Sequence, residues 1–358
     1  MRDTTAKKNF AGHRSPVAGR FLEPIAVGII GTGGMGTRHA HNLQRKVKGA
    51  KVAGLYDLDA GRMAQVAAEC GPASVFHDPY ELIADDRIDA VLIASPDETH
   101  ADFVLACIQH DKPVLCEKPL ATNAEDARII IDAETAAGRQ MVTVGFMRRF
   151  DSYHVAVKET VASGILGRPV LFRGIHRNAQ AVPALPPRLI VTGSAVHDVD
   201  SARWLLQQEV EEVFACGRRI DPALREDAVD LLLLQLSLSG NCLATIEVYI
   251  SARYGYEVTA EIIGEQGTAV TAQPVEAILR HQQHQSTLVH AEWLERFQDA
   301  YVAELEQWVQ TLHGGPFIGA NAWDGYMSLL VAEACLASLD SGQPEGVEIP
   351  TRPTLYGE

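Results

Sequence analysis

Residues 25–41 read IAVGIIGTGGMGTRHAH, and this stretch decides the fold. An apolar segment of strand character runs into Gly31-x-Gly33-x-x-Gly36, and we expect a helix directly after it. The first glycine allows the tight turn, the second lets the backbone approach a pyrophosphate, and the third lets the helix pack on the strand. The helix N-terminus offers free N–H groups to phosphates. The pattern therefore predicts a dinucleotide-binding turn.

Asp57 supports this interpretation, because it ends the next apolar segment, KVAGLYD, about 20 residues after the last glycine. A carboxylate at that place accepts hydrogen bonds from the ribose of NAD and disfavours the 2′-phosphate of NADP. We therefore expect NAD as the cofactor. The alternative is a glycine-rich turn in an unrelated α/β protein.

Composition sets broad limits on size and partners. A chain of 358 residues is long enough for two domains, each with its own core. The formal net charge of −15 disfavours nucleic acid and anionic membranes as partners, and no apolar run reaches the length of a membrane span. The six cysteines are scattered and form no CxxC, so we expect free thiols and a cytoplasmic protein.

Strand and helix patterns alternate between Ile25 and Phe146. This alternation predicts a doubly wound parallel sheet of the Rossmann type, whose ligands bind at the C-terminal ends of the strands. The expected strands are 25–30, 51–57, 73–76, 89–94, 113–116 and 140–145, and the expected helices include 59–69, 98–110 and 123–138.

The pattern changes after Phe150 to strands separated by short turns, which predict an α+β domain with a large open, mainly antiparallel sheet. We expect helices on one face and another subunit on the other. The expected strands are 169–176, 210–218, 228–238, 242–252, 255–264 and 268–272, and the expected helices are 152–163, 193–206, 294–313 and 321–341. The expected units are a flexible tail (1–24), a dinucleotide-binding domain (25–146), a substrate-binding and oligomerisation domain (147–350) and a C-terminal tail (351–358).

Lys118 lies in the segment CEKP, at the C-terminal end of an expected strand and hence near the nicotinamide. Its ammonium can hydrogen-bond a substrate hydroxyl and stabilise negative charge on oxygen. The alternative is a surface salt bridge with Glu117. Ser95, Pro96, Thr99 and His100 follow another strand and are expected near the nicotinamide end of the cofactor, although Asp97 or Thr99 could instead cap a helix.

Four motifs, GIIGTGGMG, SPDETH, CEKPL and GFMRRFD, occur in an order and spacing that resemble the Gfo/Idh/MocA family of nicotinamide-dependent oxidoreductases. HRNA (176–179), SAVHDVDSARWLL (194–206), ARYGYEV (252–258), RFQDAYVAELEQWV (296–309) and AWDGY (322–326) resemble its inositol 2-dehydrogenase branch. The resemblance implies a Rossmann domain followed by an α/β domain, a homotetramer built on the open sheet, and NAD-dependent oxidation of a ring secondary hydroxyl. The substrate expected from it is an inositol or a related cyclic polyol or sugar.

The resemblance also implies roles for individual residues. Lys118 matches the lysine that bonds the reacting hydroxyl, with a cis bond to Pro119, and His197 matches the proton acceptor. The substrate-binding positions implied are Arg148, His176, Asn178 and a tyrosine of Tyr254 and Tyr256. The expected cofactor-binding residues are Gly31, Gly33, Gly34, Met35, Gly36, Asp57, Ser95, Pro96, Thr99, His100, Glu117 and Lys118.

Gly193 departs from the family pattern, which has an aspartate four residues before the histidine. An acid there could reach the imidazole, fix its tautomer and stabilise the imidazolium. Three consequences are open: His197 works without a carboxylate, Lys118 takes more of the proton transfer, or the substrate is a different and bulkier sugar. Asp198 is expected to face away, and Asp200 to approach either His197 or Arg203.

Competing interpretations accompany these expectations. His197 could be a structural histidine, and Arg148 with Arg149 a solvated pair. His281 and His284 have a spacing that suits a metal, but a third ligand is missing, so we expect no metal site. An oxidise–eliminate–reduce cycle on a glycoside with retained NAD is an alternative function, and a non-enzymatic NAD sensor is a further one.

Overall fold

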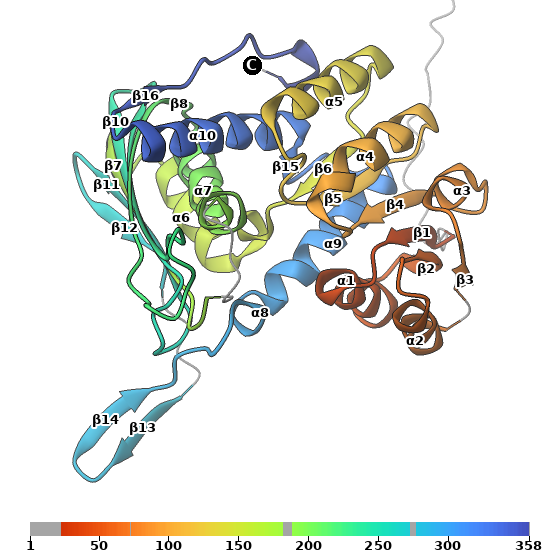
Figure 1. Cartoon of the computed structure of the whole chain (residues 1–358), viewed down its shortest axis with the longest axis horizontal. Coiled ribbons are helices and arrows are strands. Elements are labelled where there is room, and N and C mark those ends of the chain that lie inside the picture. Colours follow the sequence, from red (N-terminus) through yellow and green to blue (C-terminus); the bar gives the residue numbers. More distant parts are fainter. Residues whose placement is uncertain (1–22, 72, 182–187, 273–276, 358) are drawn as a thin grey trace, which may run out of the picture.

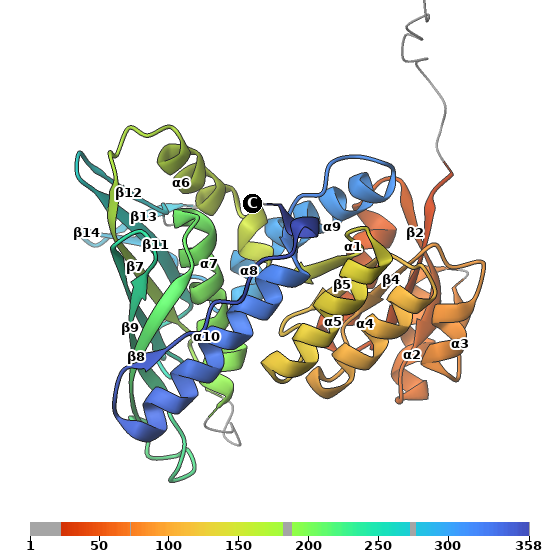
Figure 2. The same cartoon turned by 90° about the horizontal axis from the view of Figure 1, so that it is seen from above.

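A computed structural model describes residues 23–71, 73–181, 188–272 and 277–357. Residues 1–22 of the expected N-terminal tail lie outside this range. The described chain contains two large sheets, the first built mainly from residues 25–145 and the second from residues 169–346. Figures 1 and 2 show them at opposite ends of the molecule, with helices between them.

The first sheet has the order β15-β6-β5-β4-β1-β2-β3, and all its neighbours are parallel except β15 and β6. Its strands are β1 (Ile25–Ile30), β2 (Ala50–Tyr56), β3 (Ser74–Val75), β4 (Ala90–Ile93), β5 (Val114–Glu117), β6 (Val142–Gly145) and β15 (Ala320–Asn321). Its helices are α1 (Gly34–Arg45), α2 (Ala60–Cys70), α3 (Pro79–Ala84), α4 (His100–Gln109) and α5 (Ala124–Ala137). The doubly wound sheet expected from the sequence is confirmed.

Burial explains why this region reads as short, continuous apolar runs. Every residue of β4, β5 and β6 is buried, because helices cover both faces of the sheet. One core cluster packs against α4 and α5, and a second packs against α1 and α2. The carboxyl ends of β1, β4, β5 and β6 are therefore held in fixed positions relative to one another.

The second sheet has the order β12-β11-β7-β10-β9-β8-β16 and is mainly antiparallel, as expected. Its strands are β7 (Pro169–Arg177), β8 (Val210–Arg218), β9 (Leu231–Leu238), β10 (Cys242–Tyr249), β11 (Glu257–Gly264), β12 (Thr268–Val270) and β16 (Glu345–Gly346). Only β7 and β10 pair in parallel among these strands. A long connection separates these two strands in the chain, as a parallel pair requires.

Helices α6 (Ser152–Ala162), α7 (Val196–Leu206) and α10 (Ala322–Ser341) all lie on the inner side of the second sheet, as Figures 1 and 2 show. In both views no helix of the described chain covers the outer side. Residues of β9 alternate accordingly, with Leu232 and Leu234 buried and Leu233 48% exposed. The open face expected from the sequence is present.

The last third of the chain returns to the first domain. Helix α8 (Trp293–Arg296) leads into α9 (Gln298–Leu312), whose Leu305, Trp308 and Val309 join the core cluster of β1 and α1. Strand β15 extends the first sheet. Tyr356 is buried, and its hydroxyl donates to Glu134 Oε2 of α5 (2.5 Å), so the C-terminal segment is docked. Segments from the last third of the chain thus form part of the first domain.

A hairpin of β13 (Ile278–His281) and β14 (His284–Thr287) projects away from the second sheet in Figure 1 and was not expected. His281 and His284 face each other across it and are exposed. Within the described ranges, no group of three or more histidine, cysteine or acidic residues could hold a metal ion. All six cysteines are free, and no described helix is long and apolar enough to cross a membrane.

Candidate active site

The turn between β1 and α1 has the shape that a pyrophosphate needs. Gly31 has φ +92°, and a Cβ on Gly36 would lie 1.8 Å from the carbonyl oxygen of Gly31, so neither position tolerates a side chain. A Cβ on Gly33 or Gly34 would meet nothing within 4 Å, which leaves the front of the turn open. Helix α1 has no side-chain cap and no acid in its first turn. Its first N–H groups are therefore free for phosphate oxygens.

Asp57 follows β2, and its carboxylate accepts hydrogen bonds from the Thr32 backbone N–H (2.5 Å) and hydroxyl (2.9 Å). It also accepts from the backbone N–H of Asp59 (2.7 Å) and from Arg62 Nη2 (2.8 Å). Burial raises the pKa of Asp57, but these donors outweigh burial and the pKa is lowered. The ionised carboxylate is held beside the open turn, where it fits the ribose of NAD.

The segment after β4 forms a compact loop beside the segment after β5. Ser95 Oγ and Thr99 Oγ1 are 2.7 Å apart, and the Thr99 hydroxyl donates to Pro96 O (2.8 Å). The ring of His100 is buried and bonds Pro119 O (2.7 Å) and Ser95 O (3.0 Å), so it ties the two loops together. Neither Asp97 nor Thr99 makes a side-chain cap to the following helix. The Lys118–Pro119 bond is cis, as the resemblance implied.

A cleft of about 410 Å³ lies between the two domains. Five of the expected substrate and catalytic residues line it together: Lys118, His176, Asn178, His197 and Tyr256. Its other lining residues are Met35, Asp97, Glu117, Met147, Leu189, Gly193, Ser194, Ile250, Trp293 and Tyr301. Residues far apart in the chain therefore meet at one place beside the dinucleotide turn.

Lys118 reaches across the cleft, and its Nζ donates a hydrogen bond to Gly193 O (3.2 Å). Burial lowers the pKa of Lys118, although the carboxylates of Glu117 and Asp97 oppose the shift. Glu117 does not form a surface salt bridge with Lys118, because its carboxylate bonds His39 Nε2 (2.7 Å) inside the first domain. A lysine with a lowered pKa can exchange protons as well as stabilise charge.

His197 is the second residue of α7, and it is 7% exposed. Its ring meets the edge of the Phe146 ring with centroids 5.9 Å apart, and its Nδ1 is buried without a hydrogen-bond partner among the described residues. Burial first, and then repulsion from Lys118, Arg148 and His176 in their protonated forms, lowers the pKa of His197 well below its usual range. The imidazole is therefore neutral when nothing is bound.

His176 is fixed by a carboxylate behind it. Asp198 Oδ2 is 2.9 Å from His176 Nδ1, and Arg148 Nη2 is 3.1 Å from the same nitrogen, so the two groups together fix the ring with Nε2 directed away from them. The Tyr256 hydroxyl lies 3.4 Å from that Nε2. Asp198 is in turn paired with Arg148 Nη1 (2.6 Å). Burial raises the pKa of Asp198, but Arg148 and His176 outweigh burial and hold it below its usual value.

Two of the expected substrate-binding residues lie outside the cleft lining. Arg148 is buried behind His176 in its pair with Asp198 and does not line the cleft. Tyr254 is 51% exposed, and its hydroxyl bonds Glu257 and Arg177. Arg149, which the sequence did not single out for function, pairs with Asp200 and Asp324 away from the cleft. The side-chain partner of Asp200 is therefore Arg149, not His197 or Arg203.

Sequence reasoning missed Asp97, Asp198, Trp293 and Tyr301. Asp97 stands in the quoted SPDETH motif, so its place after a strand was an available signal. Asp198 was expected to face away from the histidine at 197, and it does, but toward His176. Trp293 and Tyr301 reach the cleft because α8 and α9 return to the first domain. The periodicity of apolar residues in the sequence does not indicate where a helix packs in the fold.

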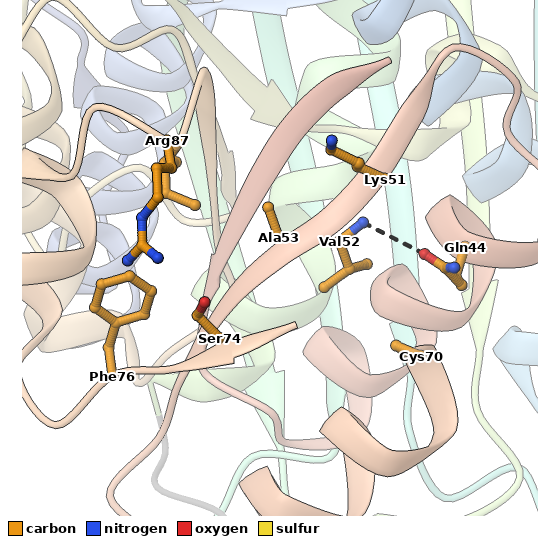
Figure 3. Close-up of a pocket in the computed structure, with 9 residues that line it drawn as sticks. Gln44, Lys51, Val52, Ala53, Cys70, Ser74, Phe76 and Arg87 are labelled. Atoms are coloured by element: carbon orange, nitrogen blue, oxygen red, sulfur yellow. Dashed lines mark hydrogen bonds between the residues drawn. The ribbon is translucent and has the colours of Figure 1, made fainter. Parts of the chain in front are cut away.

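A second hollow of about 340 Å³ lies at the first half of β2, between α1, α2 and β3 (Figure 3). Lys51, Val52 and Ala53 line it, and Gln44 accepts a hydrogen bond from the Val52 N–H. These residues precede the carboxyl end of β2, where cofactors bind on such sheets. This hollow is therefore separate from the dinucleotide site.

Comparison with known proteins agrees with this geometry. The model of the Gfo/Idh/MocA oxidoreductase family, NAD-binding Rossmann fold, matches residues 25–146, and the model of its C-terminal α/β domain matches residues 158–349. The chain belongs to the Gfo/Idh/MocA family. It is an NAD-dependent oxidoreductase that acts on CH–OH groups.

The chain is 50% identical to the inositol 2-dehydrogenase of Rubrobacter xylanophilus over 335 residues, which cover 93% of this chain and 96% of the relative. It is 44% identical to inositol 2-dehydrogenase 2 of Saccharopolyspora erythraea, over 92% of this chain and 97% of the relative. Among solved structures it resembles myo-inositol dehydrogenase from Lactobacillus casei in complex with NAD(H) and myo-inositol. That match has a TM-score of 0.90 and 32% identity, and it covers 93% of this chain and 99% of the other.

Proposed function

We propose that this chain oxidises a ring secondary hydroxyl of an inositol or a related cyclic polyol, with NAD⁺ as the hydride acceptor. The observation that carries the proposal is the convergence of Lys118 and His197 from different domains on one cleft beside the dinucleotide turn. Inositol dehydrogenases among the relatives support the choice of substrate.

The residues of the cleft suit a polyol. His176, Asn178 and Tyr256 present an imidazole, an amide and a phenol, which can donate to or accept from several hydroxyl groups at once. Lys118 and His197 supply the two groups that the reacting hydroxyl needs: one to accept its proton and one to hydrogen-bond the oxygen. From the sequence, we expect His197 to accept the proton and Lys118 to hydrogen-bond the oxygen. NAD⁺ takes up the hydride, and Met35 and Glu117 border the cleft from the cofactor domain.

Purified protein with NAD⁺ and a panel of myo-, scyllo- and D-chiro-inositol, free hexoses and glycosides tests this proposal. We expect NADH formation from at least one inositol, weaker activity with NADP⁺, and a loss of kcat by about 10²–10⁴-fold in Lys118→Met. No NADH from any inositol, or a Lys118→Met variant as active as the wild type, would contradict it.

A second candidate substrate is a bulkier sugar or glycoside. A Cβ at Gly193 would meet only the Leu189 side chain, at 3.4 and 3.5 Å, so the cleft has spare room there. If NAD survives purification and a glycoside is consumed without net NADH release, an oxidise–eliminate–reduce cycle is the better description.

We further propose a cytoplasmic homotetramer. Six free thiols suit a reducing compartment. The outer face of the second sheet exposes Phe214, Leu233 and Leu243, which a second copy would cover. Sedimentation of the purified protein tests the assembly, and a monomer at micromolar concentration would contradict it.

A further inference from the structure

The two ring nitrogens of His197 have different surroundings. Nδ1 is buried and has no hydrogen-bond partner within the described residues. The ring lines the cleft, and only Nδ1 of its two nitrogens is enclosed in this way, so Nε2 is the nitrogen that faces the cleft. Any proton that a substrate hydroxyl gives to or shares with His197 must pass through Nε2.

Gly193 explains why Nδ1 is unpartnered. It lies four residues before His197, in the π-helical turn Ile190–Ala195 that leads directly into α7. A Cβ at this position would meet only the Leu189 side chain within 4 Å, so there is space for a side chain, and the glycine itself supplies no side-chain acceptor. The carbonyl oxygen of Gly193 accepts the hydrogen bond of Lys118, and the ring of Phe146 that meets the imidazole is apolar.

This environment decides between the two neutral tautomers. With its proton on Nδ1, the imidazole would bury an N–H that has no acceptor, which folded proteins rarely tolerate. With its proton on Nε2, the N–H points to the cleft and can find water or a substrate oxygen. A neutral imidazole of the second kind has no free lone pair on the side of the substrate and cannot act as a base there.

We propose that His197 rests as the Nε2–H tautomer and donates a hydrogen bond to the substrate oxygen, and that Lys118 is the group that accepts the proton of the reacting hydroxyl. This inference rests on the function proposed above and reverses the division of roles expected from the sequence. Position 193 is then the residue that decides which of the two groups is the base.

Lys118 is placed for this role. A neutral amine has two N–H groups and one lone pair, and one N–H is held by Gly193 O, which leaves the lone pair for the hydroxyl. As the O–H bond breaks, its proton moves to Nζ and forms the ammonium. The carbon that bears this oxygen gives its hydrogen as a hydride to NAD⁺, and its C–O bond becomes a carbonyl. Burial favours the neutral amine before the reaction, and the carboxylates of Glu117 and Asp97 stabilise the ammonium after it.

The direct test is the tautomer of His197 in the cofactor-free protein, read from ¹⁵N and ¹H NMR of labelled histidines. His197→Gln identifies the signal by its loss. We expect Nε2–H in the wild type and in Gly193→Ala, which adds a Cβ but no acceptor, and Nδ1–H in Gly193→Asp, which supplies one. A wild-type His197 with its proton on Nδ1 would overturn the proposal, and this readout does not depend on any substrate.

The kinetic test is a double-mutant cycle. Glutamine at 197 keeps an N–H donor near the position of Nε2, so His197→Gln should lower kcat/KM by only about 10-fold in the wild type. In the Gly193→Asp background, where His197 becomes the base, the same change should cost about 10²–10⁴-fold. Equal losses in the two backgrounds would overturn the proposal. If no polyol is oxidised at all, the proposed function fails while the NMR result still decides the tautomer.

Discussion

Arg148 and Arg149 are neighbours in the chain, their side chains are only 2% and 7% exposed, and each pairs with an aspartate of α7. Arg148 Nη1 bonds Asp198 Oδ1 at 2.6 Å, and Arg149 bonds both carboxylate oxygens of Asp200 at 2.7 and 3.0 Å. The two pairs differ in what they touch next. Arg148 and Asp198 reach His176 at the cleft, whereas Arg149 reaches Asp324 at the start of α10.

The difference shows that residue type and burial do not identify a functional group. Both pairs are enclosed arginine–aspartate contacts on the same two elements. Only the pair at Asp198 fixes the orientation of a side chain that lines the cleft, so only that pair should influence catalysis. The pair at Asp200 should contribute to stability alone, by joining α7 and α10 to the residues that follow β6.

The largest effect should come from removing each arginine. Arg148→Met and Arg149→Met each remove the arginine partner of a buried aspartate, and each should lower the unfolding free energy by about 3–5 kcal/mol. Urea denaturation measures this loss. Kinetics at a temperature where both variants are folded should then separate them: Arg148→Met should lower kcat/KM, and Arg149→Met should leave it unchanged. Equal kinetic losses would contradict the distinction.

A smaller and more selective effect is expected from the aspartates. Asp198→Asn removes the negative charge that pairs with Arg148 and positions the His176 ring, and should lower kcat/KM by about 10–100-fold, the usual effect of such orienting partners. The matched variant Asp200→Asn should keep the wild-type kcat/KM. Steady-state kinetics with the best inositol of the panel checks both. A kinetic defect in Asp200→Asn as large as that in Asp198→Asn would show that the two pairs do not have separate roles.

Tyr254 and Tyr256 are close in the chain, but only Tyr256 lies beside His176. Tyr256→Phe removes the hydroxyl beside His176 Nε2 and should raise KM or lower kcat by about 10-fold, the value of one hydrogen bond. Tyr254→Phe removes a half-exposed hydroxyl outside the cleft and should change neither constant. If Tyr254→Phe had the larger effect, the position of the cleft would be wrong.

The smallest effect is a difference in pH dependence. The folded protein holds the pKa of Asp198 below its unfolded value, so the stability from this group is present above about pH 4 and is lost as pH falls. Burial raises the pKa of Asp200, despite Arg149, so that group contributes stability at low pH that is lost as pH rises through its folded pKa. Unfolding free energies from acidic to neutral pH should therefore fall less steeply with acid in Asp198→Asn and more steeply in Asp200→Asn. Identical profiles would contradict this.

Much of this molecule was predictable from its sequence, because the glycine turn and the buried strands leave clear local patterns. Lys118 was expected from its place after a strand and from the resemblance, and His176, Asn178 and His197 from the resemblance; all four line the cleft. The resemblance implied one tyrosine of Tyr254 and Tyr256; Gly255 between them has φ +142°, and only Tyr256 is buried, while Tyr254 is 51% exposed. Arg148 was expected to contact substrate, and only tertiary contacts show that it lies behind His176. Tyr301 reaches the cleft through the return of α9, which leaves no local signal.

A structure with NAD and myo-inositol bound tests the central claim most directly, because the account requires two groups on one hydroxyl. We predict that a single ring oxygen lies within hydrogen-bond distance, about 2.6–3.2 Å, of both Lys118 Nζ and His197 Nε2. An inositol bound elsewhere, or one whose oxygen nearest the nicotinamide is reached by only one of these two nitrogens, would contradict the account.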